Sequence, residues 1–338
     1  MGFCNQSTSE LTKTPTMKDL SGKIAVVTGG GTGMGRELVR QLIAQGCDVA
    51  TCDIVEENLN ETLALGKKEA PQGVRLMGSL CDVAKEQEVS KFREQVKDEF
   101  RTDHINLLFN NAGIGGGGSF VNSDQDEWER CFNICWFGVY NFSRAFLQML
   151  VNSEEGHVIN TSSVNGFRAS LGGNIPHTAY SAAKFAVKGF TEALINDFRF
   201  NAPHLKASVV MPGWVGTDIA LNTPKILGWK EPKDLSDEEI DEIRENQIKF
   251  GELDSDSNFS NEEFRHNLET SRTEYKKAPV SSAQAAEIII EGVKNDQWRI
   301  LIGRDAEALD KAVREEPLKA YDLDFSEKVW ATIPPIED

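Results

Sequence analysis

Six short apolar runs, each followed by a longer segment with helical spacing, constrain the architecture of this chain. The runs cover residues 24–28, 49–53, 74–78, 105–110, 157–161 and 207–211. Strands that are apolar on both faces are typical of a parallel sheet covered by helices on both sides, with ligand sites at the carboxyl ends of the strands. The pattern predicts an α/β fold, a doubly wound and mostly parallel Rossmann-like sheet in a single domain of residues 18–316.

A long acidic stretch interrupts this alternation. Residues 218–280 exceed the length of a simple crossover, and residues 231–278 contain 15 Asp and Glu against 7 Lys and Arg. Helices are expected near residues 236–250 and 260–277, because each begins at a serine with a glutamate three residues later. We expect a helical lid over the substrate, although a solvated acidic excursion is the alternative.

Composition restricts the partners and the location. The net charge is −17, no run of 18 or more apolar residues occurs, and the N-terminus is polar. We therefore expect no nucleic acid and no membrane as partner, and a cytoplasmic protein. The six cysteines form no Cys-x-x-Cys pair, so no metal site is expected. Residues 1–17 are expected to be a disordered N-terminal extension and residues 317–338 a C-terminal tail.

A glycine-rich turn follows the first strand. Residues 28–35 read Thr-Gly-Gly-Gly-Thr-Gly-Met-Gly and lead directly into an amphipathic helix. Glycines let the backbone approach a pyrophosphate, and the start of the helix offers free N–H groups to hold it. Arg36 stands where the third glycine of the Gly-x-Gly-x-x-Gly fingerprint would be, so the assignment depends on the strand, turn and helix context. The expected cofactor contacts here are Gly29, Thr32, Gly33, Met34 and Gly35.

Asp53 indicates which dinucleotide binds. It ends the second apolar run, eighteen residues after Gly35. A carboxylate at this place accepts hydrogen bonds from ribose hydroxyls and repels a 2′-phosphate, so the expected cofactor is NAD. Arg36, the basic residue nearest to the turn, is expected to point to solvent.

Hydroxyl, phenol and amine groups gather in two neighbouring segments. Ser162 and Ser163 follow the run 157–161, and Tyr180 and Lys184 are four residues apart in a helix expected from 178 to about 201. The spacing places both side chains on one helix face. A nearby ammonium favours a phenolate, so the lysine is expected to lower the pKa of Tyr180 from its ordinary value of about 10.

With these residues assembled, the chain resembles the short-chain dehydrogenase/reductase family over residues 18–217 and 281–303. The motifs are Thr-Gly-x-x-x-Gly-x-Gly at 28–35, Asn-Asn-Ala-Gly at 110–113, the Ser-Tyr-Lys set at Ser163, Tyr180 and Lys184, and Pro-Gly at 212–213. The resemblance implies that Ser163, rather than Ser162, is catalytic together with Tyr180 and Lys184.

The resemblance also implies further cofactor contacts. Asp82 and Val83 would contact the adenine, and Val215 and Thr217 the nicotinamide carboxamide. The other implied contacts are Asn111, Ala112, Gly113, Tyr180, Lys184, Pro212 and Gly213. Lys184 would hold the nicotinamide ribose, and a homodimer or homotetramer is implied.

Two departures from the family pattern lie near the expected site. Cys135 occupies the position of an asparagine that anchors a water chain to the lysine. Cysteine is a poor hydrogen-bond partner, so a relay would use another water, or Asn133 if a helix bulge brings it round. We expect activity to persist. The gap between Ser163 and Tyr180 is longer than usual, and its His177 either contacts the ligand or is a surface loop histidine, the reading favoured here.

These patterns predict an enzyme. The expected reaction transfers a hydride between NAD and a secondary alcohol or ketone, with Tyr180 moving the hydroxyl proton and Ser163 holding the oxygen. A bulky apolar or aromatic substrate is expected from aromatic residues near the predicted mouth, among them Phe167 and Trp214, with His177 a further candidate. The alternatives are an NADP-linked carbonyl reductase and a non-catalytic NAD-binding sensor or scaffold.

Overall fold

A seven-stranded parallel sheet forms the centre of the protein. The computed structural model describes residues 17–170, 175–250 and 253–333. Of the expected disordered extension 1–17, residues 1–16 lie outside this part, whereas Met17 is buried in the core and does not belong to an extension. The strand order is β3-β2-β1-β4-β5-β6-β9. The strands are β1 (Ile24–Thr28), β2 (Asp48–Asp53), β3 (Leu76–Leu80), β4 (Leu107–Asn110), β5 (Gly156–Thr161), β6 (Leu205–Pro212) and β9 (Arg299–Ile302). The predicted doubly wound α/β fold is confirmed.

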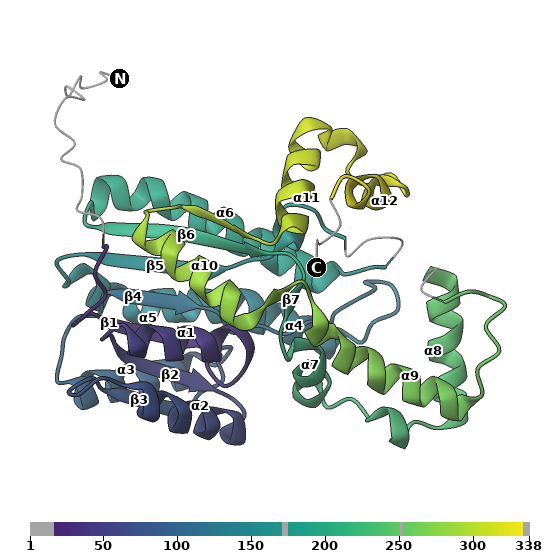
Figure 1. Ribbon diagram of the computed structural model, residues 1–338, viewed down its shortest axis with the longest axis horizontal. Helices are drawn as coiled ribbons and strands as arrows, with labels where there is room; N and C mark the ends of the chain where they lie inside the picture. Colours follow the sequence, from purple (N-terminus) through teal and green to yellow (C-terminus); the bar gives the residue numbers. More distant parts are fainter. Residues whose placement is uncertain (1–16, 171–174, 251–252, 334–338) are drawn as a thin grey trace.

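Two layers of helices cover the sheet (Figure 1). On one face α1 (Gly33–Ala44) packs between α2 (Glu56–Glu69) and α10 (Ser282–Lys294). The other face carries α3 (Glu86–Phe100), α4 (Gln125–Phe132), the π-turn η1 (Asn133–Phe137), α5 (Gly138–Val151) and α6 (Thr178–Asn201). Strand β1 serves both cores, because Ile24 and Val26 point into one cluster and Ala25 and Val27 into the other.

The neighbours β1 and β4 mark the point where the strand order reverses. Chain crossovers leave these two strands in opposite directions, which opens a crevice at their carboxyl ends. The glycine turn follows β1, and the Asn-Asn-Ala-Gly segment follows β4. The fold therefore brings these two motifs, predicted separately from the sequence, to the same edge of the sheet.

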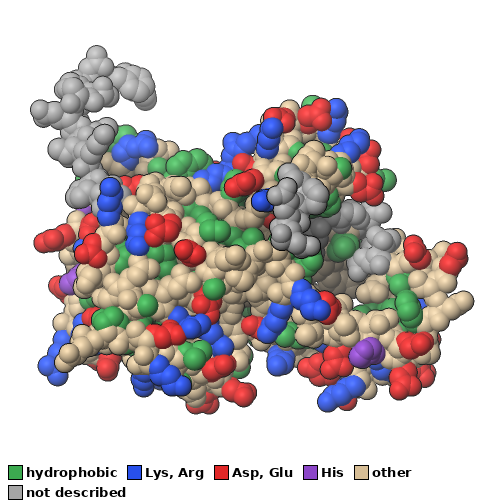
Figure 2. All heavy atoms as spheres, in the orientation of Figure 1, with side chains coloured by type: hydrophobic (Ala, Val, Ile, Leu, Met, Phe, Trp, Pro, Cys, Tyr) green, Lys and Arg blue, Asp and Glu red, His purple; other side chains and the backbone are tan. Residues whose placement is uncertain are grey.

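The acidic segment after Thr217 forms helices, as its spacing predicts. They are α7 (Ile219–Leu227), α8 (Asp237–Phe250) and α9 (Asn261–Glu274), followed by the short strand β8 (Val280–Ser281), which pairs with β7 (Val215–Gly216). Ser260 caps α9, and Glu263 returns the hydrogen bond to complete a capping box. Figure 1 shows α7 to α9 beyond the sheet, and Figure 2 shows acidic side chains on the surface of these helices.

The C-terminal region is not the tail expected from the sequence. After β9 the chain forms α11 (Arg304–Glu315), the turn η5 (Pro317–Lys319) and α12 (Phe325–Trp330), which lie at the same end of the molecule as α7 (Figure 1). Leu309 and Phe325 are buried in a small apolar cluster against Val164 and Phe167. Apolar residues spread over separate short elements give a weak periodic signal, although together they bury a common surface.

Neither a membrane span nor a metal site is found in the described ranges. No helix there combines the length and the hydropathy needed to cross a bilayer. Within the same ranges, no three His, Cys, Asp or Glu side chains lie together in a way that could hold a metal ion.

Candidate active site

The glycine turn after β1 has the geometry of an anion cradle. Gly29 and Gly33 have positive φ angles of 66° and 55°, which glycine adopts without strain. A side chain on Gly29 would place its Cβ 2.8 Å from the Cα of Ala112. Helix α1 starts at Gly33 with no side chain capping it and no acidic residue in its first turn. Its free N–H groups are therefore available to a phosphate.

Gly35, the last glycine of the turn, was expected to contact the cofactor and has a different role. It does not line the cavity. A Cβ there would lie 2.0 Å from the carbonyl oxygen of Gly29, so Gly35 allows α1 to pack tightly against the turn.

Hydrogen bonds join the glycine turn to the end of β4. The hydroxyl of Thr28 accepts bonds of 3.0 Å from the backbone N–H groups of both Asn111 and Ala112. The side-chain amide of Asn111 donates to the carbonyl oxygen of Thr28 at 3.1 Å. The Asn111 amide is thus used to hold the two loops together, while Asn111, Ala112 and Gly113 line the cavity between them.

Asp53 lies at the end of β2 beside the glycine turn. Its two carboxylate oxygens accept bonds from the N–H groups of Gly31 (2.8 Å) and Val55 (3.0 Å), which fix the carboxylate at the cavity wall. Arg36 does not point to solvent as expected. Its guanidinium donates to the Gly31 carbonyl at 2.6 Å and pairs with Glu61 at 2.6 Å. These bonds satisfy the charge of Arg36 away from the cavity.

The two residues expected to contact the adenine also lie on the cavity wall. Asp82 and Val83 line the cavity, and Arg130 forms an ion pair of 2.9 Å with Asp82. The sequence reasoning missed Ile54, Cys81 and Arg130 on this wall. The only signal for Ile54 and Cys81 as cavity residues was that they are adjacent in the chain to Asp53 and Asp82.

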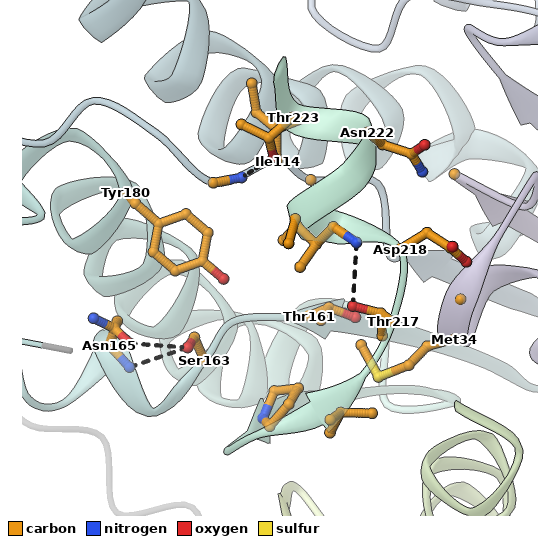
Figure 3. Close-up of a pocket in the computed structure, with 18 of the residues that line it drawn as sticks. Met34, Ile114, Thr161, Ser163, Asn165, Tyr180, Thr217, Asp218, Asn222 and Thr223 are labelled. Atoms are coloured by element: carbon orange, nitrogen blue, oxygen red, sulfur yellow. Dashed lines mark hydrogen bonds between the residues drawn. The ribbon is translucent and has the colours of Figure 1, made fainter. Parts of the chain in front are cut away.

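Ser163, Tyr180 and Lys184 line one cavity, and Figure 3 shows the Ser163 hydroxyl bonded to Asn165 near the Tyr180 ring. The Nζ atom of Lys184 lies 5.2 Å from the centre of the Tyr180 ring and donates to the carbonyl oxygen of Thr161 at 2.9 Å. Ser162 donates its hydroxyl to the carbonyl of Lys184 at 2.7 Å. The hydroxyl of Ser162 is therefore occupied. The hydroxyl of Ser163, a residue of the cavity wall, donates to the side-chain oxygen of Asn165 at 3.4 Å.

Burial controls the protonation of this group. Burial raises the pKa of the Tyr180 phenol above its ordinary value, the Cys135 thiol and Tyr275 add to the rise, and the hydrogen bond from Ser163 opposes it. Burial also lowers the pKa of Lys184. The expected lowering of the tyrosine pKa by the lysine is therefore wrong for this structure, because the loss of hydration outweighs the effect of the neighbouring amine.

Cys135 lies in the π-turn η1, fully buried, and its thiol donates to the carbonyl oxygen of Ile114 at 3.3 Å. A helix bulge is thus present at this place, but neither Cys135 nor Asn133 lines the cavity. Asn133 does not take the place of the usual asparagine. Both the Lys184 amine and the Cys135 thiol lie close to Gly113, since a Cβ on Gly113 would be 3.5 Å from the Lys184 Nζ and 3.7 Å from the Cys135 sulfur.

His177 is not the surface histidine that the sequence favoured. It lines the cavity and is stacked on Tyr180, with Asn165 3.4 Å from its Nδ1. Burial lowers the pKa of His177 to about 4, so the imidazole is neutral at pH 7. Asn165, which the sequence analysis did not select, also binds the hydroxyl of Ser163 through its backbone N–H at 3.1 Å.

One cavity of about 1400 Å³ contains the expected sites. Of the expected cofactor residues, those on its wall are Gly29, Thr32, Gly33, Met34, Asp53, Asp82, Val83, Asn111, Ala112, Gly113, Tyr180, Lys184, Pro212, Gly213, Val215 and Thr217. Trp214 lines it too, whereas Phe167 does not and packs instead against the C-terminal cluster.

Part of the cavity wall comes from residues 218–280 and from the C-terminal region. The segment 218–280 contributes apolar side chains including Ile226 and Trp229, and the C-terminal region contributes Leu309, Trp330 and Ile333. Two hydrogen bonds hold helix α7 against the glycine turn and the segment after β4. Asn222 donates to the hydroxyl of Thr32 at 2.9 Å. Thr223 accepts from the N–H of Gly115 at 2.9 Å, a bond visible in Figure 3.

Comparison with known proteins identifies the family. A family model described as short chain dehydrogenase matches residues 23–225. SadH of Mycobacterium tuberculosis strain H37Rv, an oxidoreductase by its given name, is 31% identical over 298 residues, covering 88% of this chain and 92% of SadH. The chain belongs to the short-chain dehydrogenase family. It is thereby placed in an oxidoreductase family whose members bind a nicotinamide cofactor.

Two solved structures show the same fold. A short-chain dehydrogenase/reductase from Burkholderia phymatum in complex with NAD matches with a TM-score of 0.70 at 23% identity, covering 95% of this chain and 99% of that one. An actinorhodin polyketide ketoreductase with NADPH matches with a TM-score of 0.60 at 24% identity, covering 83% of this chain and 94% of that one. At this identity they establish the architecture and leave the choice of cofactor to the residues of this chain.

The residues present fit a nicotinamide dinucleotide. The uncapped start of α1 and the glycine turn suit its pyrophosphate, and Asp53 suits an adenosine ribose with free hydroxyls. A short-chain dehydrogenase of this family would hold the nicotinamide end near Val215, Thr217 and Lys184, which lie on the wall that also carries Tyr180.

Proposed function

We propose that this short-chain dehydrogenase is an NAD-dependent oxidoreductase acting on a secondary alcohol, or on the matching ketone, of a bulky apolar or aromatic compound. The observation that carries this proposal is the shared cavity. The hydroxyl of Ser163, the phenol of Tyr180 and the amine of Lys184 line the same space that reaches the glycine turn and Asp53.

The chain's own residues supply the proton chemistry. A bound nicotinamide ring accepts or supplies the hydride. In the oxidative direction Tyr180 takes the proton of the substrate hydroxyl, and in the reductive direction it returns a proton to the carbonyl oxygen. Ser163, held by the N–H of Asn165, donates to the same oxygen and fixes its position. Lys184, anchored on the Thr161 carbonyl, stays beside the phenol.

Asp53 supports NAD over NADP. A 2′-phosphate would meet a carboxylate whose place is fixed by two backbone N–H groups, and the nearby cation of Arg36 is paired with Glu61. Asp53→Asn keeps a hydrogen-bond acceptor but removes the charge. We expect it to lower the ratio of the affinity for NAD to that for NADP about 10-fold or more, as the loss of a charged partner implies. Affinities for both dinucleotides are measured by titration of the protein's fluorescence.

An NADP-linked carbonyl reductase is the second candidate, since a ketoreductase with NADPH is among the solved structures that share this fold. Equal use of both dinucleotides by the wild type, or an Asp53→Asn variant that gains no NADP binding, would contradict the role given to Asp53.

The first experiment follows NADH absorbance while NAD and a panel of aliphatic, aryl and steroid-like secondary alcohols are offered to the protein. We expect turnover of the bulky alcohols and its loss in Tyr180→Phe, because the variant keeps the ring and removes the proton-accepting oxygen. Small aliphatic alcohols turned over as efficiently as aryl carbinols would refute the substrate class. Binding of NAD without any turnover would favour the sensor or scaffold reading.

We also propose a homodimer or homotetramer. Exposed aromatic side chains lie together on neighbouring elements, with Phe137 and Tyr140 6.4 Å apart between ring centroids and both more than 40% exposed. Apolar surface of this kind is suited to a subunit contact. Light scattering on the wild type and on Tyr140→Glu tests this, and a monomeric wild type would disprove it.

A further inference from the structure

Arg168 is a buried cation on the wall of the candidate active site. It is 3% exposed and lines the cavity that holds Ser163 and Tyr180. Its position follows from the turn after Ser163, where the Arg168 N–H donates to the carbonyl oxygen of Val164 at 3.0 Å. Nothing in the sequence motifs or in the proposed reaction uses this side chain.

The charge of Arg168 has no anionic partner among the described residues. Its Nε donates to the carbonyl oxygen of Ala320 at 2.7 Å, and its guanidinium lies 5.2 Å from the centre of the Phe325 ring. Within the described residues, no bond engages its two terminal nitrogens, which carry four N–H donors. A guanidinium stays charged in a protein, so this arrangement leaves a charge and four donors to be satisfied.

The other arginines of the described ranges show how unusual this is. Each buried or partly buried arginine there, for example Arg36, Arg130 and Arg299, forms an ion pair with a carboxylate. The arginines that form none, apart from Arg168, are exposed, and they are Arg101, Arg144, Arg199 and Arg304. Water satisfies an exposed guanidinium, whereas a buried one needs a fixed partner.

We propose that Arg168 binds a carboxylate of the substrate, so that the substrate is a secondary alcohol, or its ketone, with an apolar body and a carboxylate end. The C-terminal region contributes the apolar side chains of Leu309, Trp330 and Ile333 to the cavity wall, together with Arg304 and Asp305. Against this wall the terminal N–H groups of Arg168 form a planar fork that matches the two oxygens of a carboxylate.

The chemistry favours a carboxylate over a phosphate. One guanidinium neutralises the single charge of a carboxylate, whereas a phosphate ester would bring a second negative charge that Arg168 alone does not neutralise. The substrate would be held at two points, its carbinol oxygen at Ser163 and Tyr180 and its carboxylate at Arg168. This inference rests on the proposed function for the carbinol end only.

A matched pair of substrates tests the carboxylate end. 4-(1-Hydroxyethyl)benzoate and its methyl ester share the carbinol and the ring, and they differ in the charge that Arg168 would bind and in one methyl group. We expect the wild type to prefer the acid in kcat/KM, and Arg168→Met to lower the value for the acid on the order of 30-fold, the loss of a charge-assisted hydrogen bond. The value for the ester should change less than about twofold, because it never used the charge.

Two control variants separate anion binding from a structural role. Phe325→Leu removes the ring beneath the guanidinium and keeps the cation, so it should leave the ratio of acid to ester unchanged. Arg168→Lys keeps a charge without the fork and should lower the ratio less than Arg168→Met does. An Arg168→Met variant that loses acid and ester activity equally, or a wild type with no preference for the acid, would overturn the proposal.

Binding without turnover makes this test independent of the proposed reaction. Calorimetry in the presence of NAD compares 4-isopropylbenzoate with 4-isopropylbenzamide, neither of which has a carbinol. We expect tighter binding of the acid to the wild type and no difference in Arg168→Met. Binding of the acid without alcohol oxidation would contradict the proposed function and support the carboxylate site. Alcohol oxidation without preferential binding of the acid would support the proposed function and contradict the carboxylate site.

A truncated chain tests the competing intramolecular partner. Residues 334–338 include Glu337 and Asp338 and lie outside the described residues. A chain ending at residue 333 should prefer the acid to the same degree as the full chain. A preference that appears only after truncation would show that the protein's own carboxylates occupy Arg168, and the proposal for the intact protein would be wrong.

Discussion

His177 lies nearly parallel to Tyr180, with the two ring centroids 4.6 Å apart and the ring planes inclined by 19°. The Nδ1 atom of His177 is 3.4 Å from the side-chain nitrogen of Asn165, whose backbone N–H binds Ser163. One series of contacts therefore runs from the phenol to the serine hydroxyl. These contacts set the relative positions of the two hydroxyl groups that a substrate oxygen would meet.

The stacked histidine predicts a positioning role for His177. His177→Ala removes the ring that restrains Tyr180, so we expect kcat to fall about 3- to 10-fold, the worth of one aromatic contact, with a smaller change in KM. His177→Phe keeps the stacking and should retain most of the activity. Steady-state kinetics with the best alcohol of the panel measures both variants. Equal losses in the alanine and phenylalanine variants would show that stacking is not the reason.

The bond between Asn222 and Thr32 predicts that the lid affects cofactor retention. Asn222→Ala removes a hydrogen bond of 2.9 Å between α7 and the glycine turn. We expect the dissociation constant for NADH to rise about 2- to 10-fold, in line with the net value of one hydrogen bond. Fluorescence titration with NADH measures it. Lys225→Gln, an exposed position on the same helix, is the control. A rise of the same size in both variants would show that the bond between Asn222 and Thr32 does not retain the cofactor.

The pKa of Tyr180 predicts the pH dependence of the reaction. Burial holds this pKa above the ordinary value of about 10, so the phenol is protonated at pH 7 and must lose its proton to act as a base. We expect kcat/KM for alcohol oxidation to rise through pH 7 to 10, at up to about tenfold per pH unit, and ketone reduction not to rise. Initial rates in both directions measure this. Oxidation that is independent of pH over that range would contradict the assignment.

Local sequence patterns were sufficient for six of the seven strands and for the glycine turn, whereas β9 was not among the predicted apolar runs. The apolar run that became β1 and the glycines that follow it depend on residues adjacent in the chain, and the helix predicted to begin at Thr178 begins there. Tyr180 and Lys184 were predicted together for the same reason, since four residues fix their relation on one helix.

Contacts between distant segments were not accessible in this way. Arg168 acquires its burial from Ala320 and Phe325, more than 150 residues later in the chain. His177 could be placed on Tyr180 only after the loop before α6 was folded. The raised pKa of Tyr180 likewise depends on how much water the whole cavity excludes, which no spacing of residues encodes.

His157 predicts a loss of stability in mild acid. Its side chain is 2% exposed within β5, its Nε2 is 2.7 Å from the Ser208 hydroxyl, and its Nδ1 has no partner in the described part of the chain. Burial lowers its pKa to about 3, below the value of about 6.5 expected in the unfolded chain. Between these two values the unfolded state binds a proton that the folded state does not, so stability present above pH 6.5 is lost as the pH falls. We expect a contribution of about 1.4 kcal/mol per pH unit below 6.5, absent in His157→Asn. Urea unfolding at pH 7.5, 6.0 and 5.0 measures both proteins, and parallel curves of stability against pH would show that His157 is not the responsible group.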